Sequence, residues 1–344
     1  MAANEQQKKK LSIKKIFIFS SLTIFLSLTA IFSALLILDL SIHKKLENQG
    51  GLNYRGYRGT VVSSKKKDEF RVAFFGECIT FGYGVHWNEA YPAVIEKFMR
   101  MVYPNTTAVN LGANSHGIYG IYHDVDYYDY LDYDVAFIFD GNVGVSKSDF
   151  RGEDAFFLLF GYKTILQTYL SEKAMILKYG VSNLENAYLG KIDSNIAKKE
   201  RPIQFMLGMV ASEMEVIIKA ANKKLLSMLS MSEKQEFMSK KDKTASDEFI
   251  YYVDKIFEKL LSKNKIVYYL CKSGDYNSKQ QTLVRELIRR KYSNKVKYID
   301  LSPILDLQNV NIAFDGLHLT KYGQETLSKG LLEEIRKLKG DGKI

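Results

Sequence analysis

The sequence predicts an α/β protein: a three-layer domain with a parallel five-stranded sheet, attached to an N-terminal helix that can cross a membrane. Short apolar runs alternate along the chain with longer segments of helical periodicity. The run at 134–141 is apolar across its centre, which is typical of a parallel strand covered by helices on both faces. The N-terminal helix is predicted from 23 consecutive residues without a charged side chain.

The uncharged stretch favours an uncleaved transmembrane anchor over residues 16–41. A helix of about 20 apolar residues crosses a bilayer, whereas the apolar core of a signal peptide is usually about 7–15 residues long. Small residues such as Ala30 and Ala34 leave cleavage open. Five lysines precede the stretch and two follow closely, which predicts a cytoplasmic basic tail at 1–15 and an extracytoplasmic body.

Composition divides the rest of the chain into a linker and one domain. Residues 42–68 are polar and glycine-rich and are interpreted as a linker, and residues 69–344 as the domain. The segment 150–245 is longer than one crossover needs, and helices are expected within it at 156–170 and 202–229. This insertion is expected to be either a lid beside the ligand crevice or extra helical packing.

The five expected strands alternate with helices. The strands are 71–75, 107–112, 134–141, 265–271 and 296–301. Apolar residues at helical spacing define the faces that should cover the sheet: Val94, Phe98 and Met101; Phe249, Val253, Ile256 and Leu260; Leu283, Leu287 and Ile288; Leu327, Leu331 and Ile335. Strands that alternate with helices form parallel sheets, whose ligand crevice lies at the carboxyl ends of the strands.

Charge and composition argue against several classes of partner. The formal net charge is +10, but basic and acidic residues are mixed along the body, without zinc-finger spacing or a basic stripe. We therefore expect no nucleic-acid partner. None of the five histidines stands at ligand spacing from another histidine or a cysteine, so no metal site is expected either.

One of the two cysteines lies directly after the first expected strand. The stretch 74–85, "FFGECITFGYGV", places Cys78 at the carboxyl end of that strand. Backbone N–H groups on such a turn favour a thiolate or an oxyanion. From this stretch alone, Cys78 is a nucleophile, a disulfide partner or a small residue in a turn.

A second polar pair precedes the last expected helix. In "FDGLHLTKYG", Asp315 and His318 are three residues apart. This spacing lets the carboxylate orient the imidazole, which can then face a nucleophile. The catalytic interpretation of this pair is stronger because a candidate nucleophile turn is expected at the other end of the same sheet.

Four blocks in this order resemble the SGNH/GDSL hydrolase family of esterases and lipases. The blocks are Gly76–Gly82, Asn110–Gly117, "FDGNVG" at 139–144 and Asp315–Gly323, of which the last matches completely. The lead-in "LNYRGYRG" is similar to a segment found in membrane-anchored relatives. The resemblance implies a flavodoxin-like sheet and an active site without a cofactor.

The same resemblance implies a role for each matched residue. Cys78 stands in place of the nucleophilic serine, His318 is the base and Asp315 its orienting carboxylate. The implied oxyanion donors are the N–H of Cys78, the N–H of Ser115 or Gly117, and the side-chain amide of Asn142. Two further departures from the family pattern are Ser115 at the place of a glycine and Val143 at the place of an aspartate.

Three other features each have a functional and a purely structural interpretation. A Cys78–Cys271 disulfide is not expected, because the third strand separates the first from the fourth in the family's strand order, and Cys271 is expected to be buried. His116 is expected either to touch substrate or to be solvated. The tyrosine-rich segment 119–133 either stacks on sugars or packs against the sheet.

The resemblance implies an ester hydrolase, and the expected substrate is an O-acetylated cell-surface polysaccharide. With a sugar hydroxyl as acceptor in place of water, the same residues would perform acyl transfer. The alternative is a catalytically silent SGNH-fold module that binds polysaccharide or scaffolds an envelope assembly complex.

Overall fold

Five strands form one parallel sheet in the order β2-β1-β3-β4-β5. The strands are β1 Phe70–Gly76, β2 Thr106–Asn110, β3 Val135–Phe139, β4 Ile266–Cys271 and β5 Val296–Asp300. This is the strand order of flavodoxin-like sheets, so the predicted fold class is confirmed. The computed structural model describes residues 2–47, 52–114, 116–139, 145, 154–179, 199–229, 244–272 and 278–340.

The central strands are apolar because both of their faces are buried. In β1, Val72 and Phe74 point into one hydrophobic cluster, and Ala73 and Phe75 point into the other. Phe74 is paired with Asn110 on one side and with Phe137 on the other. Alternate residues of one strand thus contribute to two cores, which is the pattern expected of a covered parallel strand.

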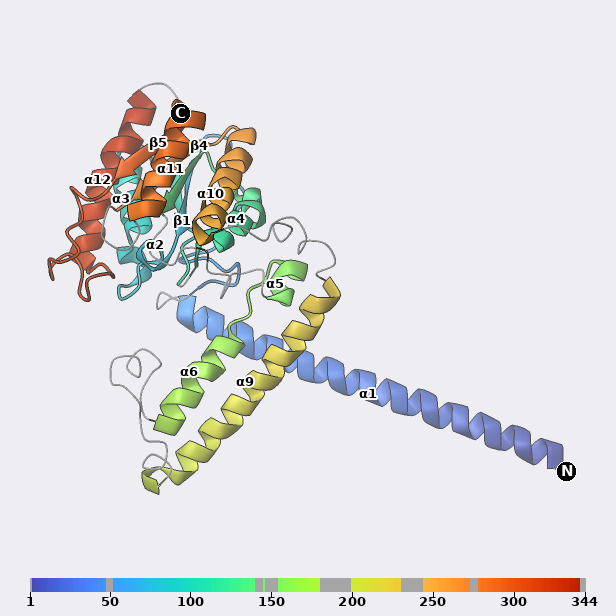
Figure 1. Ribbon diagram of the computed structural model, residues 1–344. Coiled ribbons are helices and arrows are strands. Elements are labelled where there is room, and N and C mark those ends of the chain that lie inside the picture. Colours follow the sequence, from blue (N-terminus) through green and yellow to red (C-terminus); the bar gives the residue numbers. More distant parts are fainter. Residues whose placement is uncertain are drawn as a thin grey trace.

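Helices cover both faces of the sheet (Figure 1). One face carries α3, Tyr91–Val102, and α12, Lys321–Gly340. The other carries α4, Ile118–Tyr127, α10, Ala245–Ser262, and α11, Ser278–Lys291. The predicted apolar faces of α10 and α12 are buried, which confirms the three-layer arrangement.

The prediction for α3 is wrong at one position. Val94 is buried and Phe98 is partly buried, but Met101 is 69% exposed. Tyr91, Ile95 and Met99 form the rest of the buried side of this helix. Met101 lies in the last turn, one residue before the helix ends, whereas the buried residues follow an i, i+4, i+8 row.

The tyrosine-rich segment packs against the sheet. Tyr128 and Tyr133 are fully buried, and the rings of Tyr119 and Tyr252 lie 5.2 Å apart between α4 and α10. Tyr130 is half exposed. The packing interpretation therefore accounts for most of these rings.

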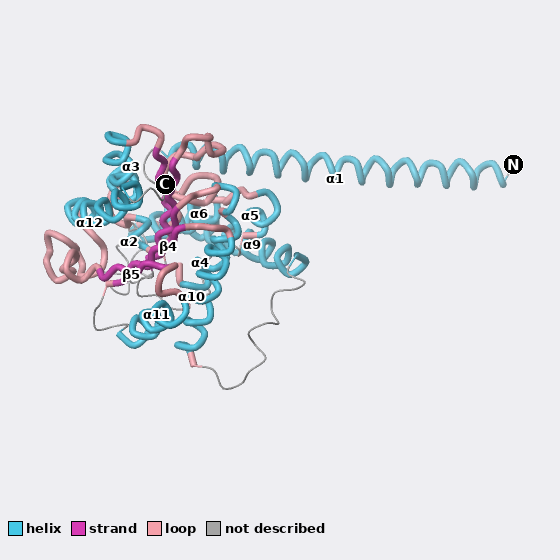
Figure 2. Tube along the Cα trace, turned by 90° about the horizontal axis from the view of Figure 1, so that it is seen from above, coloured by secondary structure: helices cyan, strands magenta, loops and turns pink. Residues whose placement is uncertain are grey.

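Helix α1, Ala2–Glu47, extends far from the body (Figures 1 and 2). Among the described residues it is the one helix long and apolar enough to cross a membrane, with a candidate span at Lys14–Lys45. The insertion contributes α5, Ala155–Phe160, α6, Leu166–Tyr179, and α9, Pro202–Leu229. The single helix expected at 156–170 is interrupted at Gly161, which ends α5 in a left-handed conformation with φ 61°.

Candidate active site

Cys78 stands on a sharp turn between β1 and a short helix. Helix α2, Cys78–Phe81, begins two residues after β1 ends and stops at Gly82, whose φ is 78°. The N–H groups of Gly82 and Tyr83 donate to the Cys78 carbonyl at 2.9 and 3.0 Å. A Cβ at Gly76 would lie 2.2 Å from Thr80 Oγ1, so this turn requires glycine there. The Cys78 side chain is partly exposed, as the prediction requires.

An arginine from the predicted linker holds the end of this turn. The buried guanidinium of Arg58 donates to the carbonyls of Phe81, Gly82 and Val85. Burial lowers the pKa of Arg58 to about 10, which still leaves it charged at neutral pH. The lead-in segment therefore positions the nucleophile turn, a role that the sequence interpretation did not assign to it.

The side chain of Asn53 shapes the segment that carries Arg58. Its amide donates to the carbonyl of Gly59 at 3.0 Å, and its Oδ1 accepts the N–H of Arg55 at 2.9 Å. Asn53 and Tyr57 are buried. The Asn…Arg-Gly pattern in the sequence was the signal that could have located this support.

The loop after β2 packs directly against α2. A Cβ at Gly112 would lie 2.3 Å from the backbone nitrogen of Phe81, too close for any side chain. The N–H of Ala113 donates to the carbonyl of Gly76 at 3.0 Å. The second block of the motif set is therefore held beside the first.

Asp315 and His318 form the predicted pair. The Nδ1 of His318 lies 2.6 Å from Oδ2 of Asp315, and Oδ1 of Asp315 accepts the backbone N–H groups of His318 at 2.7 Å and Leu317 at 3.0 Å. Partial burial by itself would raise the pKa of Asp315. The hydrogen bonds from the His318 ring and the two N–H groups outweigh burial and hold the pKa of Asp315 below its ordinary value.

Aromatic side chains frame the His318 ring. The ring of Tyr83, which follows the Cys78 turn, has its centroid 4.6 Å from that of His318. The Phe314 ring is stacked on His318 at 5.8 Å. These contacts bring the nucleophile turn and the Asp–His loop together, although the two are more than 230 positions apart in the sequence.

A buried glutamine ties the same two regions through α12. The side-chain Nε2 of Gln324 donates to the carbonyl of Ile79 at 3.3 Å, and its Oε1 accepts the N–H of Tyr91 at 2.8 Å. Gln324 is fully buried at the start of α12. It therefore fixes the position of the helix that follows His318 relative to α2.

The expected oxyanion donors are only partly described. Gly117 is the residue that precedes α4 and caps its N-terminus. Ser115 and Asn142 lie outside the described residues. The Cys78 N–H lies in the first turn of α2.

Both expectations for His116 are wrong. His116 is fully buried, and its Nε2 lies 2.8 Å from Oδ2 of Asp124, which is buried as well. Gly120 makes room for the ring, because a Cβ there would lie 2.2 Å from His116 Cε1. A buried pair between the loop and α4 could not be recognised from a lone loop histidine.

Neither Cys78 nor Cys271 forms a disulfide, and Cys271 is buried in β4. Strand β3 separates β1 from β4, as expected from the family's strand order. No disulfide therefore competes for Cys78.

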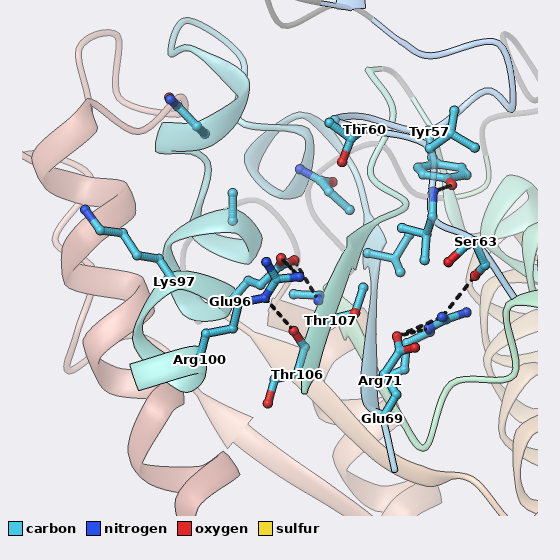
Figure 3. Close-up of a pocket in the computed structure, with 18 of the residues that line it drawn as sticks. Tyr57, Thr60, Ser63, Glu69, Arg71, Glu96, Lys97, Arg100, Thr106 and Thr107 are labelled. Carbon is cyan, nitrogen blue, oxygen red and sulfur yellow. Dashed lines mark hydrogen bonds and ion pairs between the residues drawn. The ribbon is translucent and has the colours of Figure 1, made fainter. Parts of the chain in front are cut away.

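A groove lies elsewhere, along the β2 edge (Figure 3). Its volume is about 860 Å³, and its lining includes Tyr57, Glu96 and Arg100. Cys78 and His318 are not among the lining residues. We place the candidate active site at the α2 turn, because the Tyr83 ring that follows this turn contacts the ring of His318.

Comparison with protein-family models and with curated proteins finds no match. Several solved structures are similar to this chain, and three of them illustrate the likeness. Esterase EstA from Pseudoalteromonas sp. is 9% identical over 79% of this chain and 100% of its own, with a TM-score of 0.44. A lipolytic protein of the G-D-S-L family from Desulfitobacterium hafniense DCB-2 is 14% identical over 77% of this chain and 99% of its own, with a TM-score of 0.40.

The third similar structure is a two-domain esterase active on acetylated mannans, 11% identical over 79% of this chain and 50% of its own, with a TM-score of 0.37. The class of this chain follows from its own strand order and motif blocks. It has a flavodoxin-like α/β body, and its motif blocks resemble those of SGNH/GDSL hydrolases. A cysteine-bearing turn follows β1, and an Asp–His pair precedes α12.

Proposed function

We propose that this chain cleaves acyl esters with a Cys78–His318–Asp315 triad. The observation that carries the proposal is the Asp315–His318 hydrogen bond of 2.6 Å, on a loop that contacts the Cys78 turn through Tyr83. Because Asp315 accepts a hydrogen bond from Nδ1–H, Nε2 is the nitrogen left to act as a base.

The first half of the reaction transfers the acyl group to sulfur. His318 Nε2 takes the thiol proton as Cys78 Sγ bonds to the ester carbonyl carbon, and the carbonyl π electrons move to oxygen. When the C–O bond breaks, the leaving alkoxide takes the proton from His318. The products of this half are a thioester on Cys78 and a free alcohol.

The second half returns the enzyme to its starting state. Water gives a proton to His318 and its oxygen bonds to the thioester carbon. The C–S bond then breaks, and the Cys78 thiolate regains the proton from His318. Water and an ester have become a carboxylic acid and an alcohol. A sugar hydroxyl in place of water would complete an acyl transfer through the same steps.

The negative oxygen of each tetrahedral intermediate needs hydrogen-bond donors. We assign this role to the Cys78 N–H, to the N–H of Ser115 or Gly117 and to the Asn142 amide. Losing one such donor typically lowers kcat by about 10²–10³-fold. An Asn142→Ala variant should show a loss of this size in kcat.

We assign the substrate to O-acetyl groups of a cell-surface polysaccharide, with the body held outside the cytoplasm by α1. The candidate span at Lys14–Lys45 and the five lysines before the uncharged stretch support this placement. Protease added to intact cells should cleave the body if the orientation is correct, and should leave it intact if the body is cytoplasmic.

The triad is tested by measuring hydrolysis of p-nitrophenyl acetate by the full chain in detergent. We expect hydrolysis with a transient acetyl-thioester on Cys78 seen by mass spectrometry. Cys78→Ala and His318→Ala should each lower kcat by at least about 10³-fold. The matched control is Cys271→Ala, which removes the other thiol and should keep the activity.

A titration of the thiol separates an active site from a silent module. Alkylation of Cys78 by iodoacetamide should have a midpoint below the ordinary cysteine pKa of about 8.5, and His318→Ala should move it upward. If the midpoint is ordinary, does not depend on His318, and neither the native chain nor Cys78→Ser hydrolyses the ester, the chain is a silent module.

A further inference from the structure

We propose that the insertion helices α5, α6 and α9 lie at the extracytoplasmic interface between the membrane and water. The exposed apolar faces of α5 and α9 would then be in contact with lipid. This inference rests on the proposed membrane anchor. It replaces both earlier interpretations of the insertion, a lid or extra packing, with a lipid-binding surface.

Helix α9 packs one face against α6 and has a second, apolar face that is largely exposed in the described structure. Gly208 and Ala211 are buried on the first face, and a Cβ at Gly208 would lie 2.9 Å from the Ala174 carbonyl, so the two helices approach closely. The second face consists of large apolar residues at helical spacing, all at least 42% exposed: Ile203, Leu207, Val210, Met214, Ile217 and Met228. A continuous apolar face of this length marks an interaction surface.

The composition of α9 favours a helix that lies on a membrane over one that spans it. Residues Pro202–Ser212 carry no charge, but Glu213, Glu215, Lys219 and two further lysines follow. Among the described helices, only α1 is apolar enough to span. Helices with one apolar and one charged face bind in the plane of the interface.

A contact between α5 and α1 gives the depth of the insertion. The rings of Phe156 and Phe32 lie 5.7 Å apart. Phe32 precedes Leu38, the last residue of the uncharged stretch, by six residues, which is about 9 Å along a helix. Interfacial helices bury their apolar face by about 5–10 Å, so α5 lies at the depth expected of such helices.

The exposed side of α5 agrees with this depth. Leu158, Leu159 and Phe160 are 40–63% exposed. The sides of α1 are also apolar and exposed, and the Phe32–Phe156 contact joins the two surfaces. Lipid that surrounds α1 at this level would also reach α5, and this continuity favours lipid over a protein partner.

Polar contacts hold the insertion at this height. Asp39 of α1 accepts the N–H groups of Ile165 and Leu166 at 2.9 and 2.6 Å, and His43 contacts the carbonyl of Lys163 at 2.7 Å. Ile42 of α1 also packs against Ile165 and Leu166 in a small apolar cluster. Figure 1 shows that the α6–α9 pair runs across α1 obliquely and not alongside it.

The test measures contact with lipid by quenching of a single tryptophan. The full chain with Trp87→Phe, which removes its only tryptophan, is reconstituted in phosphatidylcholine vesicles that carry brominated acyl chains. Tryptophan is introduced by Phe160→Trp or Ile217→Trp. Lys223→Trp, at an exposed position on the charged side of α9, is the matched control, and Phe25→Trp in α1 reports on the anchor.

We expect bromine near the head groups to quench Phe160→Trp and Ile217→Trp about threefold more than Lys223→Trp. Quenching of Phe25→Trp alone would overturn the inference and leave the anchor intact. Blue-shifted but unquenched emission from Ile217→Trp would mean that protein, such as a second copy, covers this face, and would also overturn it. No quenching even of Phe25→Trp would contradict the anchor itself.

Discussion

Asp315 shows how a few hydrogen bonds define the chemistry of a single residue. Its two oxygens accept one ring N–H and two backbone N–H groups from residues that follow it closely in the chain. Because these bonds stabilise the charged carboxylate, the pKa of Asp315 is held low, so that the residue would be charged if His318 serves as the base that we propose.

The lowered pKa of Asp315 predicts a pH-dependent contribution to stability. A carboxyl group whose pKa falls on folding stabilises the protein above its unfolded pKa of about 3.9. This contribution is lost as the pH falls through the folded pKa. The full chain should therefore lose its stability advantage over Asp315→Asn as the pH is lowered below about 3.9 and through the folded pKa, measured by chemical denaturation in detergent.

The His318 ring supplies part of this effect. In a His318→Ala background, the difference caused by Asp315→Asn should shrink, because the ring hydrogen bond is already absent. A difference between the native chain and Asp315→Asn that stays constant with pH would contradict the prediction.

We expect substitution of Arg58 to lower the activity, although Arg58 does not contact the reacting atoms in the proposed mechanism. The Arg58→Lys variant keeps a positive charge but cannot reach three carbonyls with one ammonium group. We expect kcat to fall by about 10–100-fold, because the Cys78 turn loses its support. Arg55→Lys, in the same segment, is the control and should keep the activity. Equal activity of the two variants would exclude a positioning role for Arg58.

Among the structural elements, the short helix α2 depends most on its neighbours. Four residues are too few to be stable as an isolated helix. Its position comes from Arg58 at its end, from the β2 loop at its side and from Gln324 beneath Ile79. The Cys78 turn is therefore a product of packing between distant segments.

The contact between the β2 loop and α2 predicts a strong effect of one methyl group. Gly112→Ala would place a Cβ 2.3 Å from the Phe81 nitrogen, so the two backbones must separate. We expect a loss of about 1–3 kcal/mol in the free energy of unfolding, together with lower activity. Thermal denaturation and ester hydrolysis measure the two effects.

Gly330→Ala in α12 is the matched control. Its added Cβ would meet only the end of the flexible Ile304 side chain, at 2.6 Å. Alanine also favours the helix over glycine by about 1 kcal/mol. If Gly112→Ala were as stable and as active as Gly330→Ala, this result would contradict the prediction that the β2 loop packs too closely on α2 to accept a methyl group.

For the whole molecule, the junction between α1 and the insertion fixes how the insertion is held against this candidate membrane-spanning helix. Asp39 serves as the acceptor for the N–H groups at the start of α6, although it lies on another helix. A cap of this kind couples the anchor to the insertion, so the two should move as one unit.

This cap predicts a local effect of Asp39→Ala. Loss of a helix cap typically costs about 1 kcal/mol, which is roughly a fivefold change in an opening equilibrium. Hydrogen exchange at the amides of Ile165 and Leu166 should be faster by this factor. Ser41→Ala, on the same helix, should leave the exchange unchanged. Unchanged exchange in Asp39→Ala would mean that α1 does not hold the insertion.

Local patterns were enough to predict most of the elements. Each expected strand is present within a few residues of its predicted bounds, because apolar runs bordered by turns depend on neighbouring residues. The sequence pattern also identified the pairing of Asp315 with His318, since the two lie three residues apart. Met101 was misplaced because helical period alone does not show which of the neighbouring apolar rows of a helix is buried, and here the row that ends at Met99 is buried.

By itself, the sequence determined the alternation of strands and helices, the apolar N-terminal helix and the positions of Cys78, Asp315 and His318. Only the tertiary structure showed that Arg58 supports the Cys78 turn, that His116 is paired in the core and that the apolar face of α9 is left exposed. The physical reason is that period and spacing act within a few residues. Burial and hydrogen-bond partners depend on segments that meet only when the chain has folded.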